Sequence, residues 1–140
     1  MKVPNKILID ADAMVALVNP DDPSHAIAEK LGGEIDGRGV KVIISDPAFG
    51  EALTVISQDT SLEKAILFAE RTLASSAEIV EVDSVLRRAG LDILKRQTSK
   101  NTRFTDCINM AVMKRERIDT IFSFDKHYKK NGFKRFGIDE

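Results

Sequence analysis

The sequence predicts an α/β fold, a three-layer α/β/α sandwich in which a mainly parallel sheet of about five strands lies between two layers of helices. Short runs that are apolar at consecutive positions, as fully buried strands are, alternate with segments whose apolar residues recur at helical intervals. Such alternation favours a parallel sheet that right-handed crossovers cover on both faces. A chain of 140 residues has the size of one ordinary domain, so we expect residues 1–140 to form a single domain.

The predicted elements follow one another along the whole chain. In order, we expect a strand at 7–9, helices at 11–18 and 24–31, a strand at 40–44, a helix from 46 that carries Glu51, a helix opened by residues 60–63, a strand at 79–82, helices from 84 and at 104–115, a strand at 120–124, a short basic turn or helix through Lys130, and a fifth strand at 133–136.

Local signals set the ends of several helices. Gly32-Gly33 predicts a glycine stop for the second helix. Asp46 is expected to cap the third helix, and Pro47 suits its first position. Residues 60–63, Thr-Ser-Leu-Glu, have the spacing of a capping box. The helix that this box opens has an apolar stripe made up of Leu62, Ala65, Ile66, Ala69 and Leu73.

Composition excludes several classes of protein. No apolar run approaches the roughly 20 residues that span a bilayer, and the N-terminus lacks the pattern of a secretory signal. We therefore expect a cytoplasmic protein with no membrane partner. The single cysteine, Cys107, cannot form an internal disulfide and lies in an apolar helical pattern that suits packing. The sequence has no Cys/His cluster of the kind that binds zinc.

The net charge of −1 hides a strong asymmetry along the chain. Residues 1–94 carry a formal charge of −7, whereas residues 95–135 carry +8. A basic C-terminal third suggests a surface for a polyanion, although solvated helix faces would give the same composition. The candidate residues are Lys95, Arg96, Lys100, Arg103, Lys126, Lys129, Lys130, Lys134 and Arg135.

Acidic residues follow two of the predicted strands. Asp10 and Asp12 come directly after the first strand, and Asp125 ends the fourth. Glu51 and Asp106 lie within one or two turns of the starts of helices. Because ligands of open α/β sheets bind beyond the carboxyl ends of the strands, these side chains are expected to converge at one edge of the sheet. Each could instead cap a helix or interact with a helix dipole.

Converging carboxylates repel one another unless a cation neutralises them. Oxygen ligands without cysteine or clustered histidine suit Mg²⁺ or Mn²⁺. Such ions lower the pKa of bound water and stabilise the attacking and leaving oxygens of a displacement at phosphorus, which is the chemistry of many nucleases. The pattern therefore indicates a metal-dependent nuclease whose basic third would hold the substrate backbone.

Four motifs spread over nearly the whole chain carry these carboxylates: Ile-Leu-Ile-Asp10-Ala-Asp-Ala-Met, Ser-Asp-Pro-Ala-Phe-Gly-Glu51, Phe-Thr-Asp106-Cys-Ile-Asn-Met-Ala and Ser-Phe-Asp125-Lys-His-Tyr. Together they resemble the PIN-domain ribonucleases and, within that family, the VapC-type toxins of toxin–antitoxin modules. The resemblance implies a PIN-like α/β/α sandwich, Mg²⁺- or Mn²⁺-dependent endonucleolytic cleavage of RNA, homodimers, and an antitoxin partner. It also implies a catalytic and metal-binding quartet formed by Asp10, Glu51, Asp106 and Asp125.

Further residues are expected to support this site. Ser123 matches a position where the family usually has Thr or Ser, which implies a hydrogen bond to a metal ligand or to water. Asp12 departs from the Ser, Thr or Asn that the family more often has, and its charge would strengthen metal binding or point into solvent. The basic residues nearest in sequence to Asp106 and Asp125 are the predicted RNA-binding residues: Lys100, Arg103, Lys126, His127, Lys129 and Lys130.

Three other functions fit parts of the pattern. A PIN nuclease of RNA processing would share the quartet. A haloacid-dehalogenase-like phosphatase would use Asp10 as its nucleophile, with Asp12 and Ser45 in its first two motifs, but Met14 stands where that family prefers Thr or Val. The sequence also offers neither a convincing catalytic Lys nor a paired acidic motif on a glycine loop for that reaction. A non-catalytic PIN relic would require an incomplete quartet, and here the quartet is complete.

Overall fold

The computed structural model describes residues 3–139 and confirms the predicted fold class. Five parallel strands form one sheet in the order β3-β2-β1-β4-β5. The strands are β1 (Lys6–Ile9), β2 (Lys41–Ser45), β3 (Glu78–Val80), β4 (Thr120–Phe122) and β5 (Lys134–Arg135). The order changes direction between β1 and β4, so the ligand crevice of such a sheet is expected beyond the carboxyl ends of these two strands.

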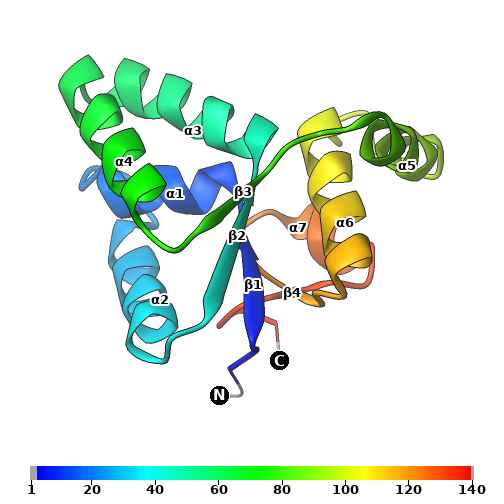
Figure 1. The fold of residues 1–140 in the computed structure, drawn as a ribbon, viewed down its shortest axis with the longest axis horizontal. Helices are drawn as coiled ribbons and strands as arrows, with labels where there is room; N and C mark the ends of the chain where they lie inside the picture. The colour runs from blue at the N-terminus through cyan, green and yellow to red at the C-terminus, as the bar shows by residue number, and fades with distance from the viewer. Residues whose placement is uncertain (1–2, 140) are drawn as a thin grey trace.

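Helices cover both faces of the sheet, α1 to α4 on one side and α5 to α7 on the other (Figure 1). Their bounds are α1 (Ala11–Val18), α2 (His25–Gly37), α3 (Asp46–Asp59), α4 (Leu62–Ala74), α5 (Ser84–Lys95), α6 (Phe104–Glu116) and α7 (Lys126–Lys130). None of the helices within residues 3–139 is long and apolar enough to cross a membrane.

The side chains of β1 alternate between two buried cores. Ile7 and Ile9 pack among residues of α1, α2 and α3, whereas Leu8 packs among residues of α5 and α6. Successive side chains of a strand point to opposite faces, so a strand between two cores is apolar at every position. This explains the consecutive apolar residues from which the strand was predicted.

Helix α2 continues through Gly32 and Gly33, so the glycine stop predicted at these residues is wrong. A Cβ at Gly32 would lie 2.9 Å from Leu17 Cδ2, which shows that this glycine allows α2 to pack closely on α1. Gly39, with a φ of +64°, supplies the left-handed residue just after the helix. Gly32 therefore serves close packing between two helices, and it does not end α2.

Two predicted helix caps are displaced by one residue. Ser45, rather than Asp46, caps α3, and its hydroxyl accepts the backbone N–H three residues on at 3.3 Å. Ser61, rather than Thr60, caps α4 through the equivalent bond at 3.1 Å. Ser and Asp, or Ser and Thr, can each cap a helix. The backbone conformation at the end of the preceding strand or turn decides which of the two neighbouring residues does so. Asp83 caps α5.

Adjacent glycines of α2 should respond oppositely to alanine. Gly33 has no atom within 4 Å of an added Cβ, so Gly33→Ala should raise the free energy of unfolding by about 0.5–1 kcal/mol through helix propensity. At Gly32 the contact with Leu17 should cancel or reverse this gain. Urea unfolding of both variants measures the difference. Equal stabilisation by the two substitutions would contradict the close contact between α1 and α2.

Candidate functional site

Four acidic side chains meet beyond the carboxyl ends of β1 and β4. Asp10 follows β1 and caps α1, and its Oδ1 accepts the next residue's backbone N–H at 2.8 Å. Asp12 and Asp106 lie in the first turns of α1 and α6, and Asp125 caps α7. Asp10 and Asp106 are each only 5% exposed. Asp10 and Asp125 are thus helix caps, and they also belong to a convergent acidic group.

Ser123 contacts two of these carboxylates and the backbone of a third acidic residue. Its Oγ donates to Asp10 Oδ2 at 2.9 Å and lies 3.4 Å from Asp12 Oδ2, and it accepts the backbone N–H of Asp125 at 3.1 Å. A hydroxyl has a single proton, so Ser123 can donate to only one of the two carboxylates at a time. The structure thus places this residue directly against Asp10, the first residue of the predicted quartet.

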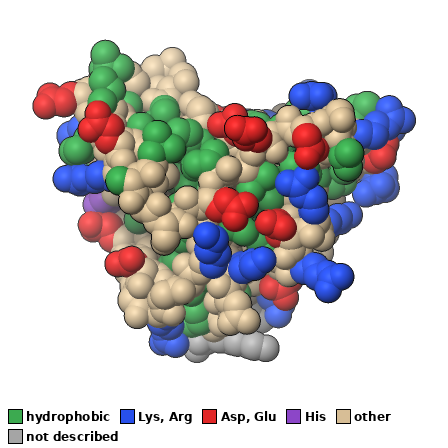
Figure 2. All heavy atoms as spheres, viewed as in Figure 1, with side chains coloured by type: hydrophobic (Ala, Val, Ile, Leu, Met, Phe, Trp, Pro, Cys, Tyr) green, Lys and Arg blue, Asp and Glu red, His purple; other side chains and the backbone are tan. Residues whose placement is uncertain are grey.

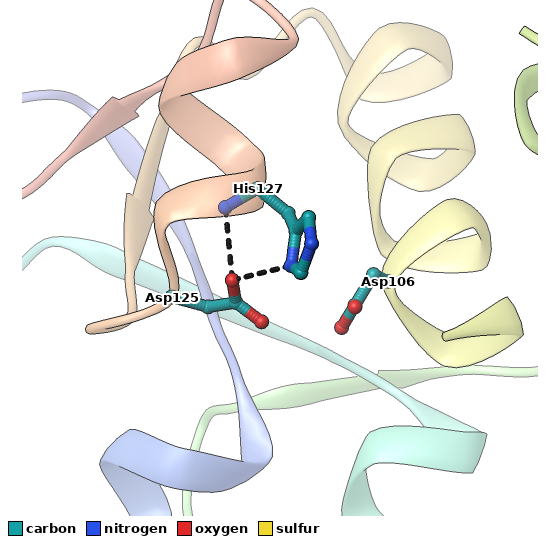
Figure 3. Close-up of side chains that lie close together, drawn as sticks. All are labelled: Asp106, Asp125 and His127. Carbon is teal, nitrogen blue, oxygen red and sulfur yellow. Dashed lines mark hydrogen bonds and ion pairs between the residues drawn. The ribbon is translucent and has the colours of Figure 1, made fainter. Parts of the chain in front are cut away.

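Asp106, Asp125 and His127 form a compact group that could hold a cation (Figure 3). One candidate ligand atom of each residue lies within 4.8 Å of the others. His127 Nδ1 is 2.7 Å from Asp125 Oδ1, and the backbone N–H of His127 donates to the same oxygen at 2.8 Å. His127 therefore orients Asp125, a role that the sequence did not suggest, while its contact with RNA stays a prediction.

A buried polar network that the sequence did not predict lies behind the carboxylates. Asn109 Nδ2 donates to Asp10 Oδ1 at 3.2 Å and to Tyr128 Oη at 2.9 Å. Ser45 Oγ donates to Asn109 Oδ1 at 2.5 Å, and Tyr128 Oη donates to Asp106 Oδ1 at 3.3 Å. The available signal was an asparagine inside the apolar run 107–113, because a buried amide needs hydrogen-bond partners.

Burial and mutual repulsion raise the pKa values of these carboxyl groups. Burial, followed by the charges of Asp12 and Asp106, raises the pKa of Asp10 to about 8. Burial raises the pKa of Asp12 to about 6 and also raises the pKa of Asp106. The group therefore cannot carry its full negative charge near neutral pH unless a cation neutralises it.

The donor set fits a hard divalent cation. The converging atoms are almost all carboxylate oxygens, which Mg²⁺ and Mn²⁺ prefer. In addition, Asp12 Oδ1 is buried and has no hydrogen-bond partner among the described residues. A buried carboxylate oxygen without a donor is costly, and a nearby cation would relieve that cost.

Glu51 lies beside this group rather than within it. Its Oε1 accepts from Arg103 Nη1 at 2.7 Å, and the backbone N–H of Arg103 donates to Asp106 Oδ2 at 3.1 Å. The Glu51 side chain is 29% exposed and that of Arg103 is 70% exposed. Arg103 thus links Glu51 to Asp106, and its predicted contact with RNA would compete with this ion pair.

Lysine and arginine side chains lie beside acidic side chains on one face of the molecule (Figure 2). Lys126, Lys129 and Lys130 all belong to α7, whose first turn is capped by Asp125. Lys100 is exposed in the loop before α6. The three lysines of α7 therefore follow the candidate metal ligand Asp125 in the chain, and Lys100 lies six residues before Asp106.

Arg135 differs from Arg103 and Lys129, which also have ion pairs but stay exposed, because its side chain is mostly buried as well as engaged within the protein. Its Nε and Nη2 donate to the Asp139 carboxylate at 2.8 and 3.0 Å, and its Nη1 donates to the Phe124 carbonyl at 3.0 Å. These bonds connect Asp139, near the C-terminus, to Phe124, the residue just before Asp125. The inclusion of Arg135 among free polyanion-binding residues is wrong, because its side chain is only 13% exposed.

Comparisons with known proteins agree with this architecture. The family model of the PIN domain matches residues 7–134. The 23S rRNA-specific endonuclease VapC20 of Mycobacterium tuberculosis, from strains CDC 1551 / Oshkosh and ATCC 25618 / H37Rv, is 24% identical over 127 residues, which are 91% of this chain and 95% of that protein. The crystal structure of M. tuberculosis VapC20, a sarcin-ricin loop cleaving toxin, superposes with a TM-score of 0.82 at 23% identity and covers 91% of this chain and 96% of that chain.

Proposed function

This chain belongs to the PIN domain family, and we propose that it is a Mg²⁺- or Mn²⁺-dependent endoribonuclease that acts as the toxin of a toxin–antitoxin module. The observation that carries the metal and nuclease part is the convergence of Asp10, Asp12, Asp106 and Asp125 at the carboxyl edge of the sheet. The relationship to VapC20, a 23S rRNA-specific endonuclease, supports RNA as the substrate and the toxin role.

The proposed roles follow from the position of each side chain. The cation would be held by Asp10, with Asp106 and Asp125 completing the site, and Glu51, which lies beside them, would contribute directly or through water. When bound, such a cation lowers the pKa of a water molecule and stabilises both oxygens of an in-line displacement at phosphorus. The protein's own contribution is orientation, because Ser123 holds Asp10 Oδ2 and His127 holds Asp125 Oδ1.

Cleavage of RNA with and without divalent cation tests this function. The purified chain should cut RNA internally in Mg²⁺ or Mn²⁺, stop in EDTA and recover when Mn²⁺ is added back. Intact RNA under all conditions would overturn the proposal. Growth arrest on expression of the wild type, but not of Asp10→Asn, would separate a toxin from a nuclease of RNA processing, which shares the same chemistry.

The PIN family match gives no support to the phosphatase alternative. That reaction needs a carboxylate oxygen of Asp10 to attack phosphorus. In the structure Asp10 Oδ1 accepts hydrogen bonds from Ala11 and Asn109, and Oδ2 accepts one from Ser123. Detection of an aspartyl-phosphate on Asp10, with small phosphomonoesters hydrolysed and RNA left intact, would reverse this ranking.

The lysines of α7 are proposed to bind the phosphates of the RNA backbone. Lys129→Ala with Lys130→Ala should weaken RNA binding and reduce the salt slope of the binding constant by about 2, if each lysine neutralises one phosphate. Affinity for Mn²⁺ should not change, because an ammonium group is not a metal ligand. Fluorescence anisotropy at several salt concentrations, with Ca²⁺ replacing Mg²⁺ to limit turnover, measures the effect.

A matched control removes two exposed lysines from the other helical layer, Lys30 and Lys64. This control changes the net charge equally, so it reports the effect of charge alone. An equal loss of RNA affinity in both double variants would show that α7 is not a specific phosphate-binding surface.

We also propose that the chain forms homodimers through α4. Of the apolar stripe predicted on this helix, only Ala65 is buried, whereas Leu62, Ile66 and Leu73 are 66%, 50% and 65% exposed. Apolar stripes of this kind on a surface helix are typical of protein interfaces. Ile66→Lys should therefore convert a dimer to a monomer in sedimentation velocity, and a monomeric wild type would contradict the proposal.

An antitoxin is the second proposed protein partner. The acidic group would attract a cationic side chain, so the antitoxin could inhibit by placing an arginine among the carboxylates in competition with the metal. Excess Mn²⁺ should then weaken inhibition by the antitoxin, and an inhibition constant that is independent of Mn²⁺ would rule out this mode.

A further inference from the structure

Asn109 is the centre of a buried network that the proposed roles leave unused. It lies on α6, one helical turn after Asp106, and its side chain is fully buried. Its Nδ2 donates to Asp10 Oδ1 at 3.2 Å and to Tyr128 Oη at 2.9 Å, and its Oδ1 accepts from Ser45 Oγ at 2.5 Å. One amide therefore joins the ends of β1 and β2 to α6 and α7.

The protons of this network have one consistent arrangement. An ionised Asp10, the form that binds a cation, can only accept, so the NH₂ group of Asn109 must face it. Because Tyr128 Oη accepts the second amide proton, its own proton is donated to Asp106 Oδ1, 3.3 Å away. The single proton of Ser45 is used on Asn109 Oδ1. In this arrangement each side-chain proton of Asn109, Tyr128 and Ser45 is donated once.

These bonds also determine which carboxylate oxygens remain for a cation. Asp10 Oδ1 accepts from Asn109 and from the next backbone N–H, which fills both of its in-plane lone pairs. Among the described residues, Asp10 Oδ2 accepts from Ser123 alone and keeps a lone pair. Rotation of the Asp10 carboxylate would break the bond to Asn109. The bond from Tyr128 restricts Asp106 in the same way, together with a backbone N–H at 3.1 Å on Oδ2.

We infer that Asn109 and Tyr128 are positioning residues of the metal site, which hold Asp10 and Asp106 in the rotation in which both carboxylates can bind one cation. The inference rests on the proposed function, because it requires these carboxylates to bind metal. Neither residue can contact RNA, since both are 0% exposed. Their effect must therefore pass through the two carboxylates.

Tyr128→Phe tests the inference most directly, because it removes one oxygen and keeps the aromatic ring in the core. Loss of an outer partner of a metal ligand typically changes metal affinity by about 10- to 100-fold. We expect the Mn²⁺ Kd, measured by calorimetry, to rise by at least about 10-fold. The KM for RNA at saturating Mn²⁺ should stay within about 2-fold, because binding of the RNA itself is untouched.

Ile108→Val is the matched control on the same helix. Ile108 is 1% exposed and lies next to Asn109 in sequence, but it packs against α5 near Gly90 rather than against the carboxylates. The variant loses a buried methylene group and so reports the effect of lower stability alone. A purely structural role for Tyr128 predicts that Tyr128→Phe and Ile108→Val both lower the Tm and leave the Mn²⁺ Kd unchanged.

Asn109→Leu provides a second test, since leucine fills a similar volume and removes both donors. It should raise the Mn²⁺ Kd more than Tyr128→Phe does, and the double variant should show less than the product of the two effects because they share one network. Wild-type affinity in both single variants, with tight binding by the wild type, would overturn this inference alone. Absence of Mn²⁺ binding in the wild type would overturn the proposed function and this inference with it.

Discussion

Asp10→Asn is expected to reduce RNA cleavage by more than about 100-fold, the upper end of the effect of losing a residue that only supports a metal ligand. The variant should also lose measurable Mn²⁺ binding. Asparagine keeps the size of the side chain but removes the charge that attracts the cation, and it leaves a single weak oxygen ligand. Calorimetry with Mn²⁺ and a cleavage assay on labelled RNA measure the two losses.

The fold should tolerate this substitution because every hydrogen bond at residue 10 can be kept. The amide oxygen can accept from the backbone N–H of Ala11 and from Asn109, as Asp10 Oδ1 does. The amide NH₂ can donate to Ser123 Oγ, whose proton is then donated to Asp12 Oδ2, 3.4 Å away. The variant also removes one of the repelling charges, so in EDTA its Tm should be higher than that of the wild type.

The combination of lost activity and raised stability distinguishes a metal ligand from a structural residue. Asp21→Asn, which changes an exposed aspartate of the loop after α1, is the charge-matched control and should leave both properties unchanged. Mn²⁺ binding that is equal in Asp10→Asn and wild type would refute the assignment of Asp10 as a metal ligand, whatever happens to the activity.

In EDTA, the stability advantage of Asp10→Asn over the wild type is expected to grow as the pH rises from 5 to about 8. Burial is the main reason why the pKa of Asp10 is about 8 in the folded protein, compared with an ordinary value of 3.8. The folded state therefore holds a proton that the unfolded state has released. The stabilisation is complete below pH 3.8 and is lost as the pH rises through about 8.

The size of this effect follows from the shift, since each pKa unit corresponds to about 1.4 kcal/mol. A change of a few kcal/mol in the difference between the two proteins is expected. Asp12, with a pKa of about 6, is present in both proteins, so its own titration largely cancels from the difference. Urea unfolding at a series of pH values measures it. Saturating Mn²⁺ should restore the wild type at pH 8, and a pH-independent difference would show that Asp10 is ionised throughout.

The order of elements could be predicted because it depends on local periodicity. β1 was recognisable since Ile7, Leu8 and Ile9 are all apolar, and the structure shows the reason, a core on each face. The ends of elements were less accessible. Gly32 reads as a helix stop in the sequence, and only the packing of α2 against Leu17 shows its actual role. Periodicity on α4 likewise cannot tell a buried stripe from an exposed one.

The candidate site was predictable where a residue's position on an element decides its place. Asp10 and Asp125 stand at the starts of helices that follow β1 and β4, and Asp106 is in the first turn of α6, the helix that leads into β4. Their convergence at the carboxyl edge therefore follows from the topology. Contacts between side chains distant in the sequence could not be predicted in this way. The bond between Asn109 and Tyr128 depends on how α6 and α7 pack. Neither asparagine nor tyrosine indicates by its type alone a role near a metal.

The candidate site takes its acidic residues from both helical layers. Asp10 and Asp12 belong to the layer formed by α1 to α4, whereas Asp106 and Asp125 begin helices of the opposite layer. Charges on these carboxylates therefore repel one another across the boundary between the two layers, and a bound cation would cross-link the layers there. Amide hydrogen exchange at the starts of α1, α6 and α7 should accelerate on removal of Mn²⁺, while the interiors of both cores stay protected.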